Sequence, residues 1–272
     1  MRRLAVCVGF MNEAYRRQID RTAADSGFSA VYFDTEAALE KEIDRFEVVF
    51  GHPAPALLRK AEKLRWLCSD FAGVEKYLDD SVWPHPDCLL SNGSGAYGPT
   101  ISEHIIMVLL MLLRRMPEYL DGLSRREWPY FAPIRSIVGS HVVMLGTGDI
   151  GSHTARRLKA LGAKVTGVCR SGRSDEPAFD AVLPVSALDE VLPIADALVM
   201  ALPATSGTAN ILSRSRIALL PPRAYVVNVG RGGAIDQDAL VEALGAGRLA
   251  GAALDVMTPE PLPGGHPLWS CP

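Results

Sequence analysis

Residues 142–151 read VVMLGTGDIG, and this segment carries the strongest structural signal in the chain. Four apolar residues suited to a buried strand run into a G-x-G-x-x-G turn, and the amphipathic segment 152–161 follows. In such a unit the first glycine permits the tight turn, the second lets the backbone approach a pyrophosphate, and the third lets the helix pack on the strand. We therefore predict a dinucleotide-binding unit whose helix N-terminus faces the phosphates, with contacts from Gly146, Gly148, Asp149, Ile150 and Gly151.

Length and composition narrow the class of protein. With 272 residues the chain exceeds the usual size of one domain, so we expect two. A hydrophobic fraction of 48% with 22% charged residues is typical of a soluble globular protein. Basic residues are scattered and the net charge is −3, which argues against a nucleic-acid partner. The five cysteines are widely spaced, as reduced thiols are, and no apolar run is long enough to span a membrane, so we expect a cytoplasmic protein without a membrane partner.

The first part of the chain alternates strand-like and helix-like segments. Apolar runs predict strands at 4–9, 28–33, 46–50 and 64–68. Helical spacing predicts helices at 13–24, 36–43 and 57–63, the first of them capped by Asn12. This alternation predicts a parallel sheet covered by helices.

Ligands of an open parallel sheet bind beyond the carboxyl ends of its strands, which makes the loops at Gly51 and at 72–74 candidates. Gly73 could free backbone N–H groups for an anion, although on these residues alone an ordinary turn glycine is the simpler interpretation. His52 and His85 lie beside prolines in loops, and we assign neither a catalytic role.

A segment rich in glycine, serine and proline, 91–99, predicts the boundary between domains over 1–98 and 99–272. The second domain begins with a long apolar helix, from Pro99 or Thr100 to about Arg115. Beyond the glycine turn, the predicted strands are 164–168, 197–202, 224–228 and 251–254, and the predicted helices are 188–192, 213–219 and 236–244. Their order indicates a doubly wound sheet.

The end of the strand at 164–168 bears on the choice of cofactor. Sites selective for NAD place Asp or Glu here to bind the ribose 2′-hydroxyl, whereas arginine accommodates a 2′-phosphate. No carboxylate occurs before Asp175, while Arg170, Ser171 and Arg173 follow the strand directly. Because guanidinium groups bind phosphate bidentately, we favour NADP(H) over NAD(H), with solvated surface arginines as the alternative interpretation.

Later strand ends also carry unusual residues. Arg231 places a full positive charge among glycines at the carboxyl end of a buried strand, where nicotinamide and substrate should meet. The candidates for cofactor binding in these segments are Leu202, Pro203, Thr208, Val229, Gly230 and Asp255, and the candidates for catalysis are Arg231 and Glu260.

Together these motifs resemble the D-isomer-specific 2-hydroxyacid dehydrogenases, a family that includes glyoxylate and hydroxypyruvate reductases. The matching segments, in chain order, are AGV at 72–74, GAYG at 95–98 with EH at 103–104, GTGDIG at 146–151, ALPAT at 201–205, VNVGRGGAID at 227–236, LDV at 254–256 and EPL at 260–262. The resemblance implies an α/β protein of two domains. The first, over 1–98, is a flavodoxin-like α/β substrate domain, and the second, over 99–272, is a Rossmann domain with a doubly wound parallel sheet. It also implies a homodimer, with the helix after Pro99 at the contact.

The resemblance further implies hydride transfer between nicotinamide and the 2-carbon of a small 2-keto or 2-hydroxy acid. Arg231 would bind the substrate carboxylate and polarise its carbonyl. The backbone N–H groups that would hold the same carboxylate are those of Ala72, Gly73 and Val74, which replaces the turn-glycine interpretation. Glu260 matches the carboxylate that pairs with the catalytic histidine and raises its pKa. Asp255 matches a position near the nicotinamide amide.

One feature of the family does not occur in the sequence. The resemblance places the acid/base histidine in a Thr-Pro-His segment downstream of HPLW, here 266–269, and the sequence ends at Pro272. His266 then matches a non-catalytic position, and none of the histidines at 52, 85, 104, 141 and 153 matches the catalytic one. The family's last helix, which completes the first domain, is absent as well. We expect the gene to continue past Pro272, because an end at WSCP has no helix cap or polar tail and would deprive Trp269 of packing partners. Without the proton donor, turnover would fall by about 10² to 10⁴ while nucleotide binding could persist.

The resulting expectation is an oxidoreductase that uses NADPH, or alternatively NADH, to reduce a small 2-keto acid such as glyoxylate or hydroxypyruvate. A nucleotide-sensing protein similar to the transcriptional corepressors of this fold is one alternative, and the absent histidine favours it. A formate- or phosphite-type dehydrogenase is another, because its small anion is also held by an arginine. Arg231 and Glu260 favour an enzyme, and no metal is expected.

Overall fold

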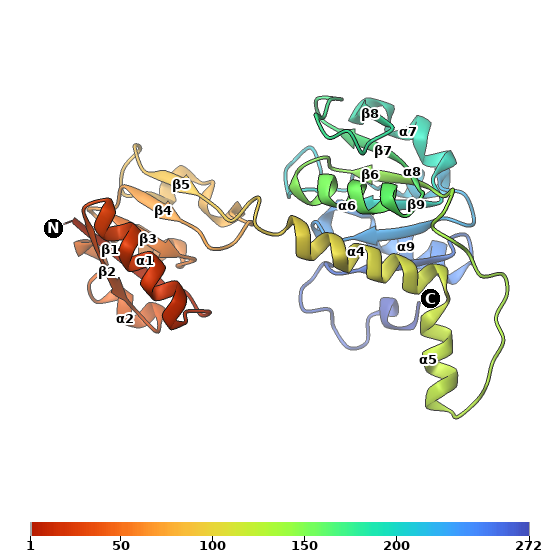
Figure 1. Ribbon diagram of the computed structural model, residues 1–272, viewed down its shortest axis with the longest axis horizontal. Helices are drawn as coiled ribbons and strands as arrows, with labels where there is room; N and C mark the ends of the chain where they lie inside the picture. The colour runs from red at the N-terminus through yellow and green to blue at the C-terminus, as the bar shows by residue number, and fades with distance from the viewer. Residues whose placement is uncertain (1, 272) are drawn as a thin grey trace. The chain divides into compact units, whose positions relative to one another are not determined.

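The computed structural model describes residues 2–271, so the outer bounds of the two predicted domains, Met1 and Pro272, lie outside the described residues. The chain divides into two α/β units, the first ending at Ser94 and the second beginning at Gly95 (Figure 1). This division falls inside the segment 91–99. Residues 95–98 group with the second unit because the Gly98 N–H donates to the carboxylate of Asp149 at 2.7 Å.

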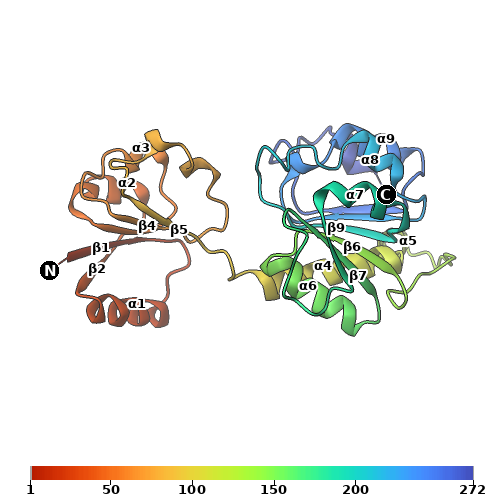
Figure 2. The same ribbon diagram turned by 90° about the horizontal axis from the view of Figure 1, so that it is seen from above.

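The first unit is built on a five-stranded parallel sheet. Its strands are β1 (Arg2–Cys7), β2 (Phe28–Tyr32), β3 (Val48–Gly51), β4 (Trp66–Cys68) and β5 (Leu89–Ser91), in the order β2-β1-β3-β4-β5. Helix α1 (Glu13–Asp25) covers one face, and α2 (Glu36–Glu40) and α3 (Pro55–Leu58) cover the other (Figure 2). This flavodoxin-like order confirms the predicted fold of the first domain.

Local sequence explains the ends of two helices in this unit. The Asn12 side chain accepts the Tyr15 N–H at 2.9 Å and caps α1, as predicted. The helix predicted at 57–63 is shorter, because α3 ends at Leu58 and the chain continues in single turns, with the Ala61 N–H bonded to the Leu58 carbonyl.

The second unit holds a six-stranded parallel sheet. Its strands are β6 (His141–Leu145), β7 (Lys164–Cys169), β8 (Ala181–Pro184), β9 (Ala197–Met200), β10 (Tyr225–Asn228) and β11 (Gly251–Leu254), in the order β11-β10-β9-β6-β7-β8. Helices α4 (Gly98–Leu113) and α6 (Asp149–Ala160) lie on one face, and α7 (Leu188–Val191), α8 (Arg214–Leu219) and α9 (Gln237–Gly245) on the other (Figure 2). This strand order is that of the Rossmann fold and confirms the doubly wound sheet. The order reverses between β6 and β9, so a ligand crevice is expected beyond their carboxyl ends.

The long helix predicted from Pro99 or Thr100 to about Arg115 is confirmed as α4, and a second helix, which was not predicted, follows it. Helix α4 ends at Leu113, Arg115 adopts a left-handed conformation with φ of 56°, and α5 runs from Met116 to Ser124. Pro117 explains the break, because its ring would clash with the carbonyl of Leu113 in a continuous helix. None of the helices within residues 2–271 combines the length and the apolar character needed to cross a membrane.

The start of β6 is fixed by a carboxylate. Asp196 accepts the backbone N–H of His141 at 2.9 Å and pairs with Arg223 Nε at 2.8 Å. Burial by itself raises the pKa of Asp196, but these two hydrogen bonds and the arginine charge outweigh it, so the pKa lies below its ordinary value.

Candidate active site

The glycine turn between β6 and α6 leaves open space in front of the backbone. Gly146 has a φ of 108°, and a Cβ there would lie 2.7 Å from the carbonyl oxygen of Ala201. A Cβ at Gly151 would collide with the carbonyl oxygen of Gly146, whereas one at Gly148 would have no neighbour within 4 Å. Only the second glycine therefore borders free space, which is where a phosphate group must approach the turn.

Helix α6 has no side-chain cap at its N-terminus. Gly148 occupies the N-cap position and cannot supply one, so the first-turn N–H groups stay available to an anion. Together with the space beside Gly148, this arrangement fits a dinucleotide pyrophosphate.

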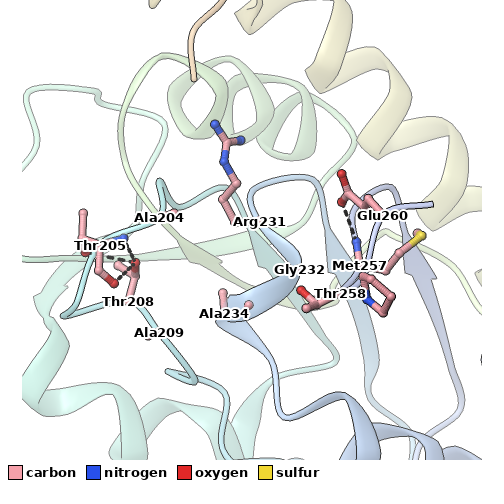
Figure 3. A pocket seen from close by; sticks show the side chains of 12 residues that line it. Ala204, Thr205, Thr208, Ala209, Arg231, Gly232, Ala234, Met257, Thr258 and Glu260 are labelled. Atoms are coloured by element: carbon pink, nitrogen blue, oxygen red, sulfur yellow. Dashed lines mark hydrogen bonds between the residues drawn. The ribbon is translucent and has the colours of Figure 1, made fainter. Parts of the chain in front are cut away.

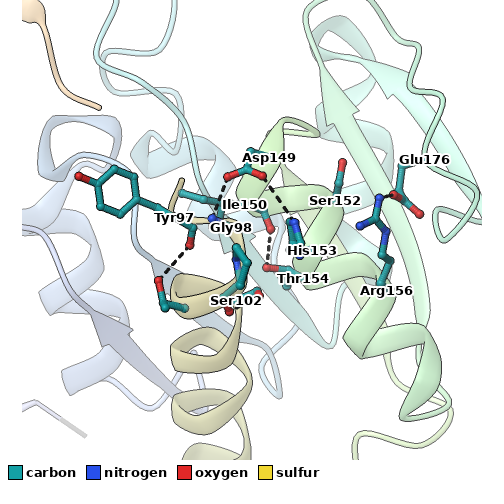
Figure 4. Close-up of polar contacts among 12 residues, drawn as sticks. Tyr97, Gly98, Ser102, Asp149, Ile150, Ser152, His153, Thr154, Arg156 and Glu176 are labelled. Atoms are coloured by element: carbon teal, nitrogen blue, oxygen red, sulfur yellow. Dashed lines mark hydrogen bonds and ion pairs between the residues drawn. The ribbon is translucent and has the colours of Figure 1, made fainter. Parts of the chain in front are cut away.

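The side chain of Asp149 is used within the protein. Its Oδ2 accepts the Gly98 N–H, and its Oδ1 lies 3.6 Å from His153 Nε2 (Figure 4). The carboxylate thus caps α4, which begins after the unit boundary, and only the backbone of Asp149 remains for a phosphate. A Cβ at Gly98 would displace the side chains of Asp149 and His153, so glycine keeps this contact in place.

The turn after β7 is ordered around a thiol. Cys169 Sγ lies 3.4 Å from Ser171 Oγ and 3.4 Å from the carbonyl oxygen of Arg173, and Ser171 Oγ accepts the Arg173 N–H at 3.3 Å. Burial by itself raises the pKa of Cys169, but hydrogen bonds from Ser171, Thr147 and backbone N–H groups outweigh it, so the pKa lies below the ordinary value.

The two arginines of this turn form no ion pair with a carboxylate of residues 2–271. Arg170 and Arg173 are exposed, and neither forms an ion pair within residues 2–271. The nearby carboxylate of Glu176 is nearly buried and pairs with Arg156, which holds the pKa of Glu176 below its ordinary value. The turn therefore offers unpaired positive charge and leaves Asp175 as its nearest exposed carboxylate.

The loop after β9 is closed by its own hydroxyl group. Thr208 Oγ1 donates to the Pro203 carbonyl at 2.6 Å and accepts the Thr205 N–H at 2.9 Å. Thr208 was predicted to bind the cofactor, and its hydroxyl here shapes the loop that contains Leu202 and Pro203.

Arg231 is braced by a buried asparagine at the end of β10. Asn228 is 1% exposed; its Nδ2 donates to the Arg231 carbonyl at 2.9 Å and its Oδ1 accepts the Gly230 N–H at 3.0 Å. A Cβ at Gly230 would lie 2.6 Å from both N and O of Leu202, so the chain passes close to the loop after β9. The half-buried Arg231 side chain donates from Nη1 to the Gly230 carbonyl at 2.8 Å.

Arg231 and Glu260 line the same cavity, which has a volume of about 320 Å³. Thr205 and Thr208 lie on one side of Arg231, and Met257 and Glu260 on the other (Figure 3). Glu260 Oε1 accepts the Met257 N–H at 2.8 Å and so closes its own turn. The cavity contains a guanidinium, which can bind the carboxylate of a small organic acid, and the carboxylate of Glu260.

Asp255 lies outside this cavity lining and faces a histidine. Its Oδ1 is 4.0 Å from His104 Nε2 of α4, and its N–H donates to the Asn228 carbonyl at 2.9 Å. His266 has a structural role: its Nδ1 accepts the Leu268 N–H, and its Nε2 lies 3.1 Å from Gln237 Nε2.

In the first unit, the loop at 72–74 was predicted to bind the carboxylate of the substrate. Within residues 2–271, the backbone N–H groups of Ala72, Gly73 and Val74 make no hydrogen bond. A run of such groups forms a concave site for an anion.

Sequence reasoning missed the residues that brace these segments. Asn228 lies within the matching segment 227–236 but was not singled out, and Ser69, which is 2% exposed beside the loop at 72–74, belongs to no motif. A polar side chain at the end of a predicted buried strand is the sequence signal that would have pointed to both.

Comparison with known proteins identifies the family. Residues 106–272 match the model of the D-isomer specific 2-hydroxyacid dehydrogenase NAD binding domain. The chain is 33% identical to glyoxylate/hydroxypyruvate reductase A of Serratia proteamaculans over 81% of this chain and 71% of that protein.

Solved structures agree with this match. A D-isomer specific 2-hydroxyacid dehydrogenase family protein of Aeromonas salmonicida superposes with a TM-score of 0.87 at 37% identity, over 100% of this chain and 87% of that one. A D-isomer specific 2-hydroxyacid dehydrogenase of Xanthobacter autotrophicus, solved with NADPH and MES, gives a TM-score of 0.82 at 25% identity, over 98% and 84%. The chain therefore belongs to the D-isomer specific 2-hydroxyacid dehydrogenase family, oxidoreductases that act on CH–OH donors with a nicotinamide cofactor.

Proposed function

We propose that this protein reduces a small 2-keto acid, such as glyoxylate or hydroxypyruvate, with NADPH. The observation that carries the proposal is the braced Arg231 at the cavity shared with Glu260. The cavity of about 320 Å³ has room for a short acid. The relative from Serratia that matches most of the chain is named for the same substrates.

Different segments of the chain bind the cofactor and the substrate. The turn at 146–151 binds the pyrophosphate through the α6 N-terminus and the space beside Gly148. When bound, the nicotinamide supplies a hydride to the 2-carbon of the acid. Arg231 binds the carboxylate and polarises the carbonyl, and the N–H groups at 72–74 are assigned to carboxylate binding on their own geometry.

Glu260 is proposed as the partner of an acid/base histidine. No histidine lines the cavity among the described residues, so this assignment follows the resemblance. Glu260 already holds the Met257 N–H through one oxygen, which fixes the carboxylate in place. A fixed negative charge would raise the pKa of a neighbouring imidazole and keep it protonated for transfer to the carbonyl oxygen.

NADPH is proposed over NADH because of the turn after β7. Arg170 and Arg173 have no carboxylate partner in the described part of the chain, and the neighbouring Glu176 is engaged by Arg156. We expect Arg170→Ala and Arg173→Ala each to raise the Kd for NADPH by about 10- to 150-fold, since one charged hydrogen bond contributes about 1.5–3 kcal/mol. The Kd for NADH should change less than twofold, and equal losses for both coenzymes would refute the preference.

The direct test is NADPH oxidation by the full-length gene product with a panel of 2-keto acids. Turnover with glyoxylate or hydroxypyruvate supports the proposal. Tight NADPH binding without turnover on any acid would instead support the nucleotide-sensing alternative.

A homodimer is proposed from the exposed apolar side chains of α5 and the segment after it. Leu123, Trp128 and Tyr130 are exposed by 69%, 100% and 85%. Large apolar side chains exposed to this extent within one segment favour a surface that another molecule covers, and we propose a second copy of the chain. Light scattering after gel filtration should give twice the monomer mass, and Trp128→Glu should give the monomer.

A further inference from the structure

The loop that offers N–H groups at 72–74 is held from behind through its carbonyl oxygens. The Phe71 carbonyl accepts Ser69 Oγ at 3.2 Å and the Gly93 N–H at 3.1 Å. The Ala72 carbonyl accepts Asn92 Nδ2 at 2.8 Å. The carbonyl groups of Phe71 and Ala72 are thus hydrogen-bonded, whereas in the described part of the chain the N–H groups of Ala72, Gly73 and Val74 are not. The loop is therefore held in an orientation that leaves its N–H groups for an anion.

Ser69 lies at the centre of this arrangement. It follows β4, is 2% exposed, and its Oγ is 3.2 Å from both the N and the O of Phe71. A hydroxyl group has one proton and two acceptor sites, so it can close the turn by donating to the carbonyl and accepting the N–H. One acceptor site then remains.

His52 fills that remaining site. Its Nδ1 lies 3.1 Å from Ser69 Oγ, and its ring packs on Phe71 with the centroids 4.6 Å apart. Burial, aided by the charge of Lys76, lowers the pKa of His52, so the ring is neutral at pH 7. With the proton on Nδ1, which we assign from the network, all three contacts of Ser69 are hydrogen bonds at once.

The position of His52 is itself fixed by the fold. It follows β3, and a Cβ at the preceding Gly51 would collide with the Cys7 carbonyl of β1, so the turn requires glycine. Lys76 Nζ donates to the His52 carbonyl at 3.2 Å from the other side of the loop. His52 therefore connects the end of β3 to the end of β4.

We propose that His52, Ser69 and Asn92 are positioning residues that fix the loop 71–74 as the receptor for the carboxylate of the substrate. The inference rests on the proposed function. None of the three needs to touch the substrate, because each acts through the backbone of Phe71 or Ala72.

The test compares substitutions at the three positions in the full-length enzyme. Ser69→Ala, His52→Leu and Asn92→Ala should each raise the KM for the 2-keto acid about tenfold, which corresponds to one lost hydrogen bond that orders the loop. The change in kcat should stay below threefold, and the Kd for NADPH should be unchanged. His52→Asn keeps an N–H donor near the position of Nδ1 and should recover most of the affinity.

A matched control removes a histidine elsewhere in the same unit. His85 Nε2 contacts the Glu62 carbonyl and has no link to the loop, so His85→Leu should leave the KM unchanged. Thermal unfolding checks that each variant is folded. If Ser69→Ala does not fold, Asn92→Ala, at the surface, tests the same loop independently.

Calorimetry with oxamate distinguishes a failure of the positioning role from a failure of the proposed function. If the wild type binds oxamate and turns over 2-keto acids but the variants keep the wild-type KM and oxamate Kd, the positioning role is wrong. If the substitutions lower kcat as much as they raise KM, or if His52→Asn has the same KM as His52→Leu, the positioning role is also wrong. A wild type that neither binds oxamate nor turns over would refute the proposed function itself.

Discussion

Removing the Asn228 side chain is predicted to damage both stability and catalysis. Asn228→Ala leaves the Gly230 N–H and the Arg231 carbonyl without their partner in a site that is 1% exposed. Each buried backbone group that loses its hydrogen bond costs about 1–3 kcal/mol, so the two together cost about 2–6 kcal/mol. That is a large part of the roughly 5–15 kcal/mol by which a domain is stable.

Urea unfolding followed by circular dichroism measures the first effect, and steady-state kinetics measures the second. The midpoint should fall with an unchanged m value, and kcat/KM should fall about tenfold or more because Arg231 loses its fixed backbone. Asn228→Asp keeps an acceptor for Gly230 and should lie between the wild type and Asn228→Ala.

Asn210 provides the control for this experiment. It is exposed, and its side chain makes no hydrogen bond within residues 2–271. Asn210→Asp should therefore change neither quantity. An Asn228→Ala protein with the wild-type midpoint and wild-type kcat/KM would refute the reasoning.

Three further predictions concern the second unit. Gly148→Ala should fold normally yet bind NADPH at least tenfold more weakly, whereas Gly151→Ala should also lower the melting temperature, because only its Cβ meets backbone; calorimetry and thermal scans separate the two. Cys169, whose pKa is lowered, should react with iodoacetamide at pH 8 faster than Cys88, whose pKa burial raises, and NADPH should slow the reaction; mass spectrometry of the labelled peptides decides. The pKa of Asp196 is lower in the folded state, so the stability that Asp196 contributes is present above the ordinary value of 3.8 and is lost as the pH falls through the folded pKa. Acid unfolding of Asp196→Asn should therefore show a shallower loss of stability below pH 4 than that of the wild type. An unchanged slope would count against the pairing of Asp196 with Arg223.

Local patterns were enough to predict the nucleotide-binding unit. The strand, glycine turn and helix around 142–161 depend on near neighbours in the chain, and the parallel sheets follow from the alternation of strands and helices, although β5 and β8 were not predicted. Arg231 could be singled out because a charge among glycines at a strand end is unusual in any context.

Bracing contacts could not be predicted in the same way. Asn228 and Ser69 act on backbone groups near them in sequence, but their burial, and the contact of Ser69 with His52, depend on packing between strands. The carboxylate of Asp149 illustrates the same limit, since its partner Gly98 lies 51 residues away. Helix α5 was not predicted, although Pro117 in its first turn is a local signal for the start of a helix.

The central claim is that the guanidinium of Arg231 binds the acid beside the nicotinamide. The most direct measurement is kcat/KM for glyoxylate with NADPH in the full-length wild type and in Arg231→Gln, together with the Kd for NADPH in each. Loss of two charged hydrogen bonds predicts a fall in kcat/KM of about 10²- to 10⁴-fold while the Kd for NADPH stays within twofold. Equal kcat/KM in the two proteins, or an equal loss in coenzyme affinity, would contradict the account.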